Sequence, residues 1–251
     1  MLGGKKVKSN TCYEYTDSYI AFLDILGFKN LVTKNTCDQI ARLFQNIRNP
    51  LSEMGLGTSI EIDLSEVKMK VMSDSICFHI ATDKKYALLS IVAVCQAFQG
   101  ELLGLVCPVI LRGAVVHGDI YQDGDITFGS GLVDAYSLEE NEARYPRIII
   151  KHDILDEVID SVDDSIGAEE NYILHILYQM LYTDIIDGKK VSCIDYMEAY
   201  EGFDTDGTKI KTLYKYVCSQ IKQLTDDKRY KWQYVKNQIL RFYKPENTKT
   251  E

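Results

Sequence analysis

The chain has 251 residues, of which 46% are hydrophobic and 26% charged, a composition typical of a folded globular protein that excludes disorder. Its 28 basic and 37 acidic residues give a formal net charge of −9. Binding duplex DNA requires a basic surface, so we expect no DNA partner.

Targeting signals and metal motifs are missing from the sequence. No apolar run reaches the about 20 residues that a membrane span needs, and the N-terminal letters MLGGKKVKSN contain no apolar stretch typical of a signal peptide. We therefore expect a cytoplasmic protein with no membrane partner. None of the seven cysteines forms a CxxC pair, and the four histidines show no zinc-ligand spacing, so we expect free thiols and no zinc site.

Hydrophobic periodicity predicts an α+β fold. The predicted elements are, in chain order, a buried strand at Tyr19–Phe28, an amphipathic helix at Thr36–Met54 that begins near Thr36 or Asp38, two short strands within Ser65–Ile80, a buried helix at Asp83–Leu105, a strand at Val106–Val116, a helix at Gly131–Asn141 and a strand at Pro146–Lys151. A polar excursion, GDIYQDGDI, follows the strand at Val106–Val116. The order indicates a ferredoxin-like βαββαβ core.

The last part of the chain predicts a helical extension. Leu174–Asp184 and Lys190–Met197 resemble the arms of a strand hairpin, and Lys209–Leu224 and Asp226–Tyr243 are amphipathic with helical spacing. No residue of these two helices follows a metal-ligand or nucleophile pattern, so we expect them to be structural. We divide the chain into a flexible N-terminus (1–17), a core domain (18–200) and a C-terminal helical hairpin packed on the core (205–246).

Two aspartates stand out against this background. Asp24 lies inside an apolar strand, where a carboxylate is costly unless it is paired or binds a metal ion. Asp74 lies in the predicted hairpin turn, and a ferredoxin-like sheet places the first strand beside that hairpin, so the two carboxylates would meet. Hard oxygen ligands suit Mg²⁺ or Mn²⁺, with substrate phosphates completing the shell. Alternatively, Asp24 accepts a backbone hydrogen bond and Asp74 only stabilises the turn.

Several sequence motifs, taken in their order along the chain, resemble those of a known protein family. They are YIAFLDILGFKN (Tyr19–Asn30), MSDSI (Met72–Ile76), LRGAVVHGDIY (Leu111–Tyr121), FGSGLVDAYSLE (Phe128–Glu139), ARYPRIII (Ala143–Ile150), CIDYM (Cys193–Met197) and Tyr230–Trp232. Together they resemble the class III nucleotidyl cyclase catalytic domain, and within that superfamily the bacterial pyrimidine cyclases of the Pycsar antiphage systems. The resemblance spans Tyr19 to Trp232 and names 18–200 as the catalytic domain.

The resemblance implies an activity and its partners. The enzyme would be a phosphorus–oxygen lyase that converts a pyrimidine nucleoside triphosphate, UTP in preference to CTP, into the 3′,5′-cyclic nucleotide and pyrophosphate. The product, cyclic UMP or cyclic CMP, would be a second messenger of antiviral defence that activates a separate effector protein. The resemblance also implies a homodimer, with the aspartates of one subunit facing the Arg112 strand and the 131–141 helix of the other.

The resemblance also assigns the metal and triphosphate residues. Asp24 and Asp74 would be the catalytic aspartates that hold two Mn²⁺ or Mg²⁺ ions, with the backbone carbonyl of Ile25 as a further ligand. The backbone of Gly27 and Phe28 would bind the triphosphate.

Four basic residues are further candidates. Lys70 corresponds to a base-reading lysine of purine cyclases, and Arg112 would contact the nucleotide. Lys189 and Lys190 would lie near the leaving group. The residues alone also allow a solvated strand lysine at Lys70, a structural ion pair at Arg112 and two solvated turn lysines.

One departure from the family pattern concerns the helix that reads GLVDAYSLEENEAR. Class III cyclases carry an Asn there and an Arg four residues later, whereas this chain has Asp134 and Leu138, and Arg144 lies too far along. The usual ribose and transition-state pair is therefore missing or relocated. Asp134, Tyr136 and Glu139 are the remaining candidates on this helix.

Three alternative functions stay open. Lys70 favours an adenylyl or guanylyl cyclase of the same fold. The missing Asn/Arg pair favours a catalytically degenerate, cyclase-like module that binds nucleotide. A palm-type polymerase would share the paired aspartates, but it needs a basic template-binding surface that an acidic chain does not favour.

Overall fold

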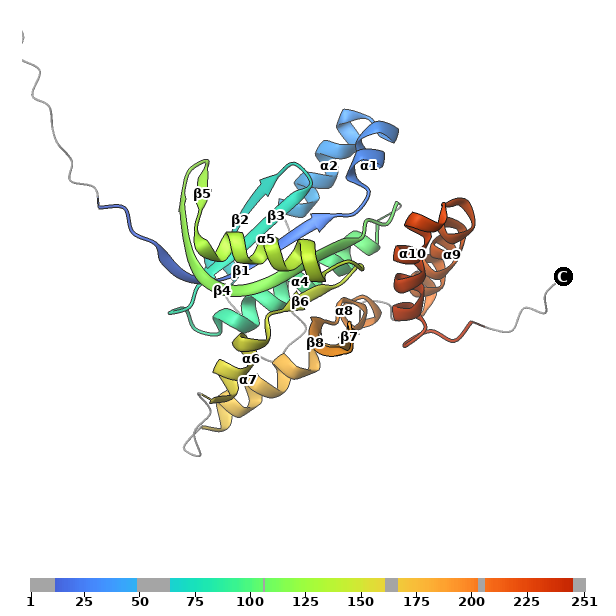
Figure 1. Ribbon diagram of the computed structural model, residues 1–251. Helices are drawn as coiled ribbons and strands as arrows, with labels where there is room; N and C mark the ends of the chain where they lie inside the picture. Colours follow the sequence, from blue (N-terminus) through green and yellow to red (C-terminus); the bar gives the residue numbers. More distant parts are fainter. Residues whose placement is uncertain (1–11, 49–63, 106, 161–166, 203–205, 246–251) are drawn as a thin grey trace, which may run out of the picture.

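The protein is described by a computed structural model that covers residues 12–48, 64–105, 107–160, 167–202 and 206–245 (Figure 1). Its strands are β1 Thr16–Ile25, β2 Lys68–Met72, β3 Ser75–Ala81, β4 Leu111–Asp123, β5 Ile126–Phe128, β6 Ile148–Ile150, β7 Leu181–Ile186 and β8 Lys189–Ile194. Its helices are α1 Phe28–Lys34, α2 Cys37–Arg48, α4 Ala87–Leu103, α5 Ser130–Glu142, α6 His152–Asp160, α7 Ala168–Gln179, α8 Tyr196–Gly202, α9 Thr208–Gln223 and α10 Asp226–Ile239, with a short 3₁₀ turn at Leu64–Glu66.

One mixed sheet forms the centre of the molecule. Its strands follow the order β2-β3-β1-β4-β6-β8-β7, and β5 pairs with β4 alone. Among the first four strands of that order, every adjacent pair is antiparallel, which is the predicted ferredoxin-like arrangement. β6 then adds parallel to β4, and the β7–β8 hairpin extends the sheet. The α+β fold with a ferredoxin-like core is therefore confirmed. No helix in the described ranges is long and apolar enough to cross a membrane.

Side-chain alternation along β1 assigns Asp24 to one face of the sheet. Leu23 and Ile25 belong to the main core cluster, which includes most of α4. Phe22 packs in a second cluster with Ala135 of α5. Successive strand residues point to opposite faces, so Asp24 lies on the α5 face. Figure 1 shows α5 lying across β1 and β4 on that face.

Two glycines allow α5 to approach the sheet closely. A Cβ atom on Gly118 of β4 would lie only 2.9 Å from the Cα atom of Gly131 in α5. Any larger residue at either position would push the helix away from the strand. The segments LRGAVVHGDIY and FGSGLVDAYSLE therefore carry a packing requirement in addition to any chemistry.

The first predicted strand is wrong at both ends. β1 runs from Thr16 to Ile25 rather than from Tyr19 to Phe28. It ends before Phe28 because Gly27 has a φ angle of +82°, which ends the extended backbone. Phe28 instead begins α1.

The next helix, α2, begins as predicted beside Thr36. The Gln39 amide donates to Thr36 Oγ1 at 3.3 Å, and the Thr36 amide donates to Gln39 Oε1 at 2.8 Å, which is a capping box. α2 extends to Arg48, and the rest of the predicted helix, residues 49–54, lies outside the described residues.

Two further predictions need correction. The polar segment after Val116 is not an excursion, because β4 continues to Asp123 and its end pairs with β5, as in the pair Tyr121–Phe128. The predicted strand at Leu174–Asp184 begins only at Leu181. Residues before it continue α7, whose Ile176 and Leu177 pack into the main core.

The two C-terminal helices pack together and onto the core. Their apolar residues form one cluster with residues of α4, α8 and the segment before β4: Leu103, Ile110, Tyr196, Met197, Tyr200, Ile210, Leu213, Val217, Val235 and Ile239. The helices therefore cover an apolar surface of the core. The domain limits 1–17, 18–200 and 205–246 stay predictions, and residues 1–11, 203–205 and 246 lie outside the described residues.

Candidate active site

Asp24 and Asp74 lie at one end of adjacent strands. Asp24 is the penultimate residue of β1 and pairs in register with Ser75, the first residue of β3. Asp74 precedes Ser75 in the β2–β3 turn, and its backbone carbonyl accepts a hydrogen bond of 2.8 Å from the Ile25 amide. Both aspartates are partly exposed. The fold therefore brings the two residues next to each other, where a ligand from solvent can reach them.

Arg112 lies between two carboxylates. It stands opposite Asp24 in the β1–β4 register, and its Nε atom is 3.1 Å from Asp24 Oδ2. The same Nε atom is 2.5 Å from Oε1 of Glu139, a residue of α5. Of the two alternatives for Arg112, the structure thus shows an ion pair, and it places that pair on a candidate catalytic aspartate.

Glu139 is the most buried acid of this group. Its side chain is 2% exposed, and Oε1 accepts no well-directed hydrogen bond from the described residues despite its short ionic contact with Arg112. Burial raises the pKa of Glu139 to about 7, the positive charge of Arg112 opposes this rise, and the charge of Asp24 adds to it. Of the three candidates on this helix, Asp134 and Tyr136 are exposed, and only Glu139 is buried against Arg112.

Lys231 of α10 completes the group. Burial lowers the pKa of its ammonium group, as does repulsion from Arg112, whereas the charges of Asp24 and Glu139 raise it. These interactions place Lys231 within electrostatic reach of all three residues. We refer to Asp24, Arg112, Glu139 and Lys231 as the charge cluster. Its members come from four separate parts of the chain.

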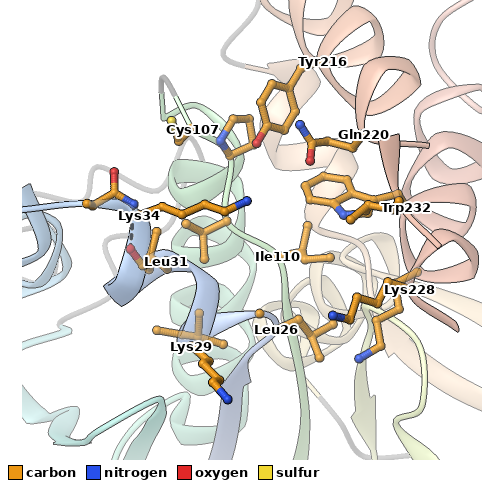
Figure 2. A pocket seen from close by; sticks show the side chains of 17 residues that line it. Leu26, Lys29, Leu31, Lys34, Cys107, Ile110, Tyr216, Gln220, Lys228 and Trp232 are labelled. Atoms are coloured by element: carbon orange, nitrogen blue, oxygen red, sulfur yellow. Dashed lines mark hydrogen bonds between the residues drawn. The ribbon is translucent and has the colours of Figure 1, made fainter. Parts of the chain in front are cut away.

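A cavity of about 710 Å³ adjoins the charge cluster (Figure 2). It lies between the β1–α1 connection with α1 on one side and the α9–α10 hairpin on the other. Ile25 and Gly27, which follow Asp24 closely, form part of its wall, and Lys231 lines it as well. The remaining lining residues are Leu26, Lys29, Leu31, Lys34, Asn35, Cys107, Pro108, Val109, Ile110, Tyr216, Gln220, Leu224, Lys228 and Trp232.

The two aspartates fit a metal ion that takes most of its ligands from water and substrate phosphates. Within the described ranges, no three His, Cys, Asp or Glu residues are grouped so that they could hold a metal ion. Mg²⁺ is often bound through one or two carboxylates, with water and substrate phosphates as the other ligands. Asp24, Asp74 and the Ile25 carbonyl offer such a set of hard oxygen atoms. To bind a metal ion, Asp24 would have to give up its ion pair with Arg112. Arg112 would then keep its ion pair with Glu139.

The other predicted side chains lie outside the charge cluster. Phe28 packs edge-on against Phe44 of α2, with ring centroids 6.1 Å apart, so its side chain is structural. Lys70 Nζ lies 3.1 Å from Asp125 Oδ1 and 3.2 Å from the Gly124 carbonyl, in the β4–β5 turn. Lys189 and Lys190 are exposed on β8 and do not line the cavity.

Two of the motif segments anchor the C-terminal hairpin. Arg147, from ARYPRIII, is buried and donates to Asp184 Oδ2 at 2.8 Å, and the Tyr234 hydroxyl of α10 donates to the same oxygen at 2.7 Å. Tyr196, from CIDYM, donates its hydroxyl to the Pro146 carbonyl at 2.9 Å. These residues act in packing and orient α10, which carries Lys231.

Comparisons with known proteins add a distant structural likeness. Neither the protein-family models nor the curated proteins give a match. Among solved structures, the chain is similar to the adenylyl cyclase CyaB from P. aeruginosa, with 14% identity and a TM-score of 0.44 over 73% of this chain and 95% of that one. The catalytic core of a rhodopsin-guanylyl cyclase with converted specificity has 12% identity and a TM-score of 0.44 over 71% and 93% of the two chains.

A third similar structure is the adenylate/guanylate cyclase/hydrolase from Silicibacter pomeroyi, with 15% identity and a TM-score of 0.42 over 73% of this chain and 96% of that one. Scores of this size describe a remote likeness and assign no activity. The function proposed below therefore rests on the residues of the site.

Proposed function

We propose that the chain is a nucleotidyl cyclase, a phosphorus–oxygen lyase that converts a nucleoside triphosphate into a 3′,5′-cyclic nucleotide and pyrophosphate. The observation that carries this proposal is the position of Asp24 and Asp74 at one end of adjacent strands, where the Ile25 amide bonds to the Asp74 carbonyl at 2.8 Å. Two oxygen-bearing side chains beside a cavity with cationic walls suit a metal-bound triphosphate.

The proposed reaction forms one bond and breaks another. The 3′-oxygen of the ribose attacks the α-phosphorus, and the bond from that phosphorus to the oxygen bridging to the β-phosphate breaks. Pyrophosphate leaves, and the hydroxyl proton passes to water. Two Mn²⁺ or Mg²⁺ ions, when bound by Asp24, Asp74 and the Ile25 carbonyl, would make the hydroxyl more acidic and neutralise the triphosphate.

The remaining roles fall to residues around the aspartates. Arg112 and Lys231 place positive charge beside Asp24, where it can stabilise charge that develops on the phosphates. The backbone of Gly27 and Phe28 would contact the triphosphate. Lys70 stays a proposed nucleotide contact. Its ion pair with the fully exposed Asp125 is weak and would not hold it away from a ligand.

The nucleobase and the biological role follow only from the resemblance to Pycsar cyclases. On that ground we propose UTP, with CTP as a second substrate, so that the product is cyclic UMP or cyclic CMP. The cyclic nucleotide would act in antiviral defence by activating a separate effector protein in the cytoplasm.

We also propose that the working form is a homodimer. In the single chain, Arg112 pairs with both Asp24 and Glu139 of the same chain, so a partner would add residues to a cluster that already exists. Light scattering on the active protein tests this proposal. A monomeric particle that turns over at full rate would contradict it.

One assay tests the activity itself. The protein is incubated separately with UTP, CTP, ATP and GTP in the presence of Mn²⁺, and the products are identified by mass. We expect cyclic UMP as the main product, no product in excess EDTA, and recovery when Mn²⁺ is restored. Cyclic AMP or cyclic GMP as the main product would support the purine alternative instead.

A degenerate nucleotide-binding module is the second candidate. The observation that favours it is the ion pair of Asp24 with Arg112, since this pair occupies a carboxylate that the metal ions would need. Saturable binding of nucleoside triphosphates without any cyclic product, for all four nucleotides and both metal ions, would select this candidate over the enzyme.

A further inference from the structure

The cavity beside the charge cluster is strongly cationic. Four lysines, Lys29, Lys34, Lys228 and Lys231, line it, and its lining contains no Asp or Glu, although the whole chain has a net charge of −9. Within the described residues, no acidic side chain forms an ion pair with any of these lysines. Because ammonium groups repel one another, an anion in the cavity would be stabilised.

Other walls of the cavity are apolar and aromatic. Trp232 of α10 and Tyr216 of α9 meet edge to face, with ring centroids 5.7 Å apart. In Figure 2, Lys34 extends from α1 across the cavity toward Trp232. A flat aromatic surface facing ammonium groups matches a molecule that has a polyanionic end and a planar aromatic end. The volume of about 710 Å³ is typical of small-molecule sites.

The cavity is also placed next to the candidate catalytic residues. Its wall includes Ile25 and Gly27, which lie one and three positions after Asp24 in the sequence. Lys231 belongs both to this wall and to the charge cluster. A ligand whose phosphates contact Lys231 would therefore have its phosphates beside Asp24.

We infer that this cavity is the nucleoside triphosphate pocket and that the C-terminal hairpin forms one of its walls. Lys34, Lys228 and Lys231 bind the phosphates, and the nucleobase packs on Trp232. The inference rests on the proposed cyclase function and deepens it. It also gives the hairpin, which the sequence predicts to be structural, a direct part in binding the substrate.

Trp232 is the only tryptophan of the chain, so its fluorescence reports on this cavity. The full-length protein is titrated with UTP, CTP, ATP, GTP and inorganic tripolyphosphate, with Mg²⁺ and again with EDTA. We expect a saturable change in emission with at least one nucleoside triphosphate, and competition by tripolyphosphate. The double variant K34Q/K228Q and the single variant K231Q should each weaken binding at least about tenfold, as expected for the loss of charge-assisted contacts.

The matched control is K211Q, which removes an exposed lysine from α9 outside the cavity and should leave binding unchanged. Lys34 and Lys228 are themselves exposed, so their replacement should not unfold the protein, and circular dichroism checks this. The inference is overturned if none of the five probes alters Trp232 emission, or if K34Q/K228Q binds as tightly as K211Q.

Failure of the inference and failure of the proposed function give different results. Formation of cyclic nucleotide with an unchanged KM in K34Q/K228Q and K231Q would refute the pocket and retain the cyclase. Binding that is lost in the lysine variants, together with no cyclic product from any nucleotide, would retain the pocket and refute the cyclase.

Discussion

Asp24 and Arg112 face each other in register across β1 and β4, and Arg112 Nε lies 3.1 Å from Asp24 Oδ2. Glu139 holds the same nitrogen from the α5 side at 2.5 Å. A divalent ion that binds Asp24 would therefore leave Arg112 with a buried carboxylate partner. This arrangement lets Asp24 exchange an ion pair for a metal ion without leaving a buried charge unpaired.

Replacing either aspartate should abolish turnover without unfolding the protein. D24N and D74N each remove a charged oxygen ligand of the proposed metal ions, whereas Arg112 keeps its contact with Glu139. Cyclic product measured by mass spectrometry, together with thermal unfolding, checks both parts of the expectation. D187N, at an exposed turn residue, is the control and should remain active. If D24N and D74N both retain activity with Mn²⁺, the two-metal proposal is wrong.

Glu139 should make stability depend on pH. Its folded pKa of about 7 lies above the ordinary glutamate value of 4.5, so the native state binds the proton more tightly than the unfolded state. Between these two values, rising pH therefore removes stability, by about 3 kcal/mol in total. E139Q has no such carboxyl group, so its stability relative to the wild type should improve by this amount from pH 4.5 to 8. Urea unfolding at both pH values measures it, and a constant difference would refute the prediction.

Arg147 should matter for folding rather than for chemistry. Its side chain is 3% exposed and its guanidinium pairs with Asp184 at 2.8 Å, so R147A would leave that carboxylate without its buried partner. We expect a loss of about 3 kcal/mol in the free energy of unfolding. R42A removes an exposed helical ion pair with Asp38 and should cost less than about 0.5 kcal/mol. Equal losses in the two variants, measured by urea unfolding, would contradict the structural role of Arg147.

Truncation at Asp204 should give insoluble or poorly folded protein. The shortened chain would lose α9 and α10 and expose Leu103, Ile110 and Tyr196, which the hairpin covers. Apolar surface exposed to water costs about 25 cal/mol per Å². Soluble yield and circular dichroism check the expectation. A soluble, dimeric fragment that has lost only its activity toward one nucleotide would show that the hairpin determines specificity and is not needed for folding.

The linear sequence was sufficient for the order of the βαββαβ core elements, and it drew attention to the two aspartates. Period-two and period-3.6 patterns are local, so the ferredoxin-like order could be predicted. Asp24 was conspicuous because a carboxylate inside an apolar strand costs free energy unless it is paired or binds a metal ion. The capping box at Thr36 and Gln39 and the β2–β3 turn are local too. The apolar run that predicted a strand as far as Phe28 was misleading, because the positive φ of Gly27 ends β1 early.

Only the tertiary structure decided what surrounds Asp24. Arg112, Glu139 and Lys231 are far apart in the sequence, and none of them carries a local pattern that pairs it with an aspartate. β4 brings Arg112 into register with Asp24. The close approach of Gly118 and Gly131 allows α5 to pack near β4, so that Glu139 contacts Arg112. Because charge interactions depend on distance in space, chain spacing could not show that α10 would place Lys231 there.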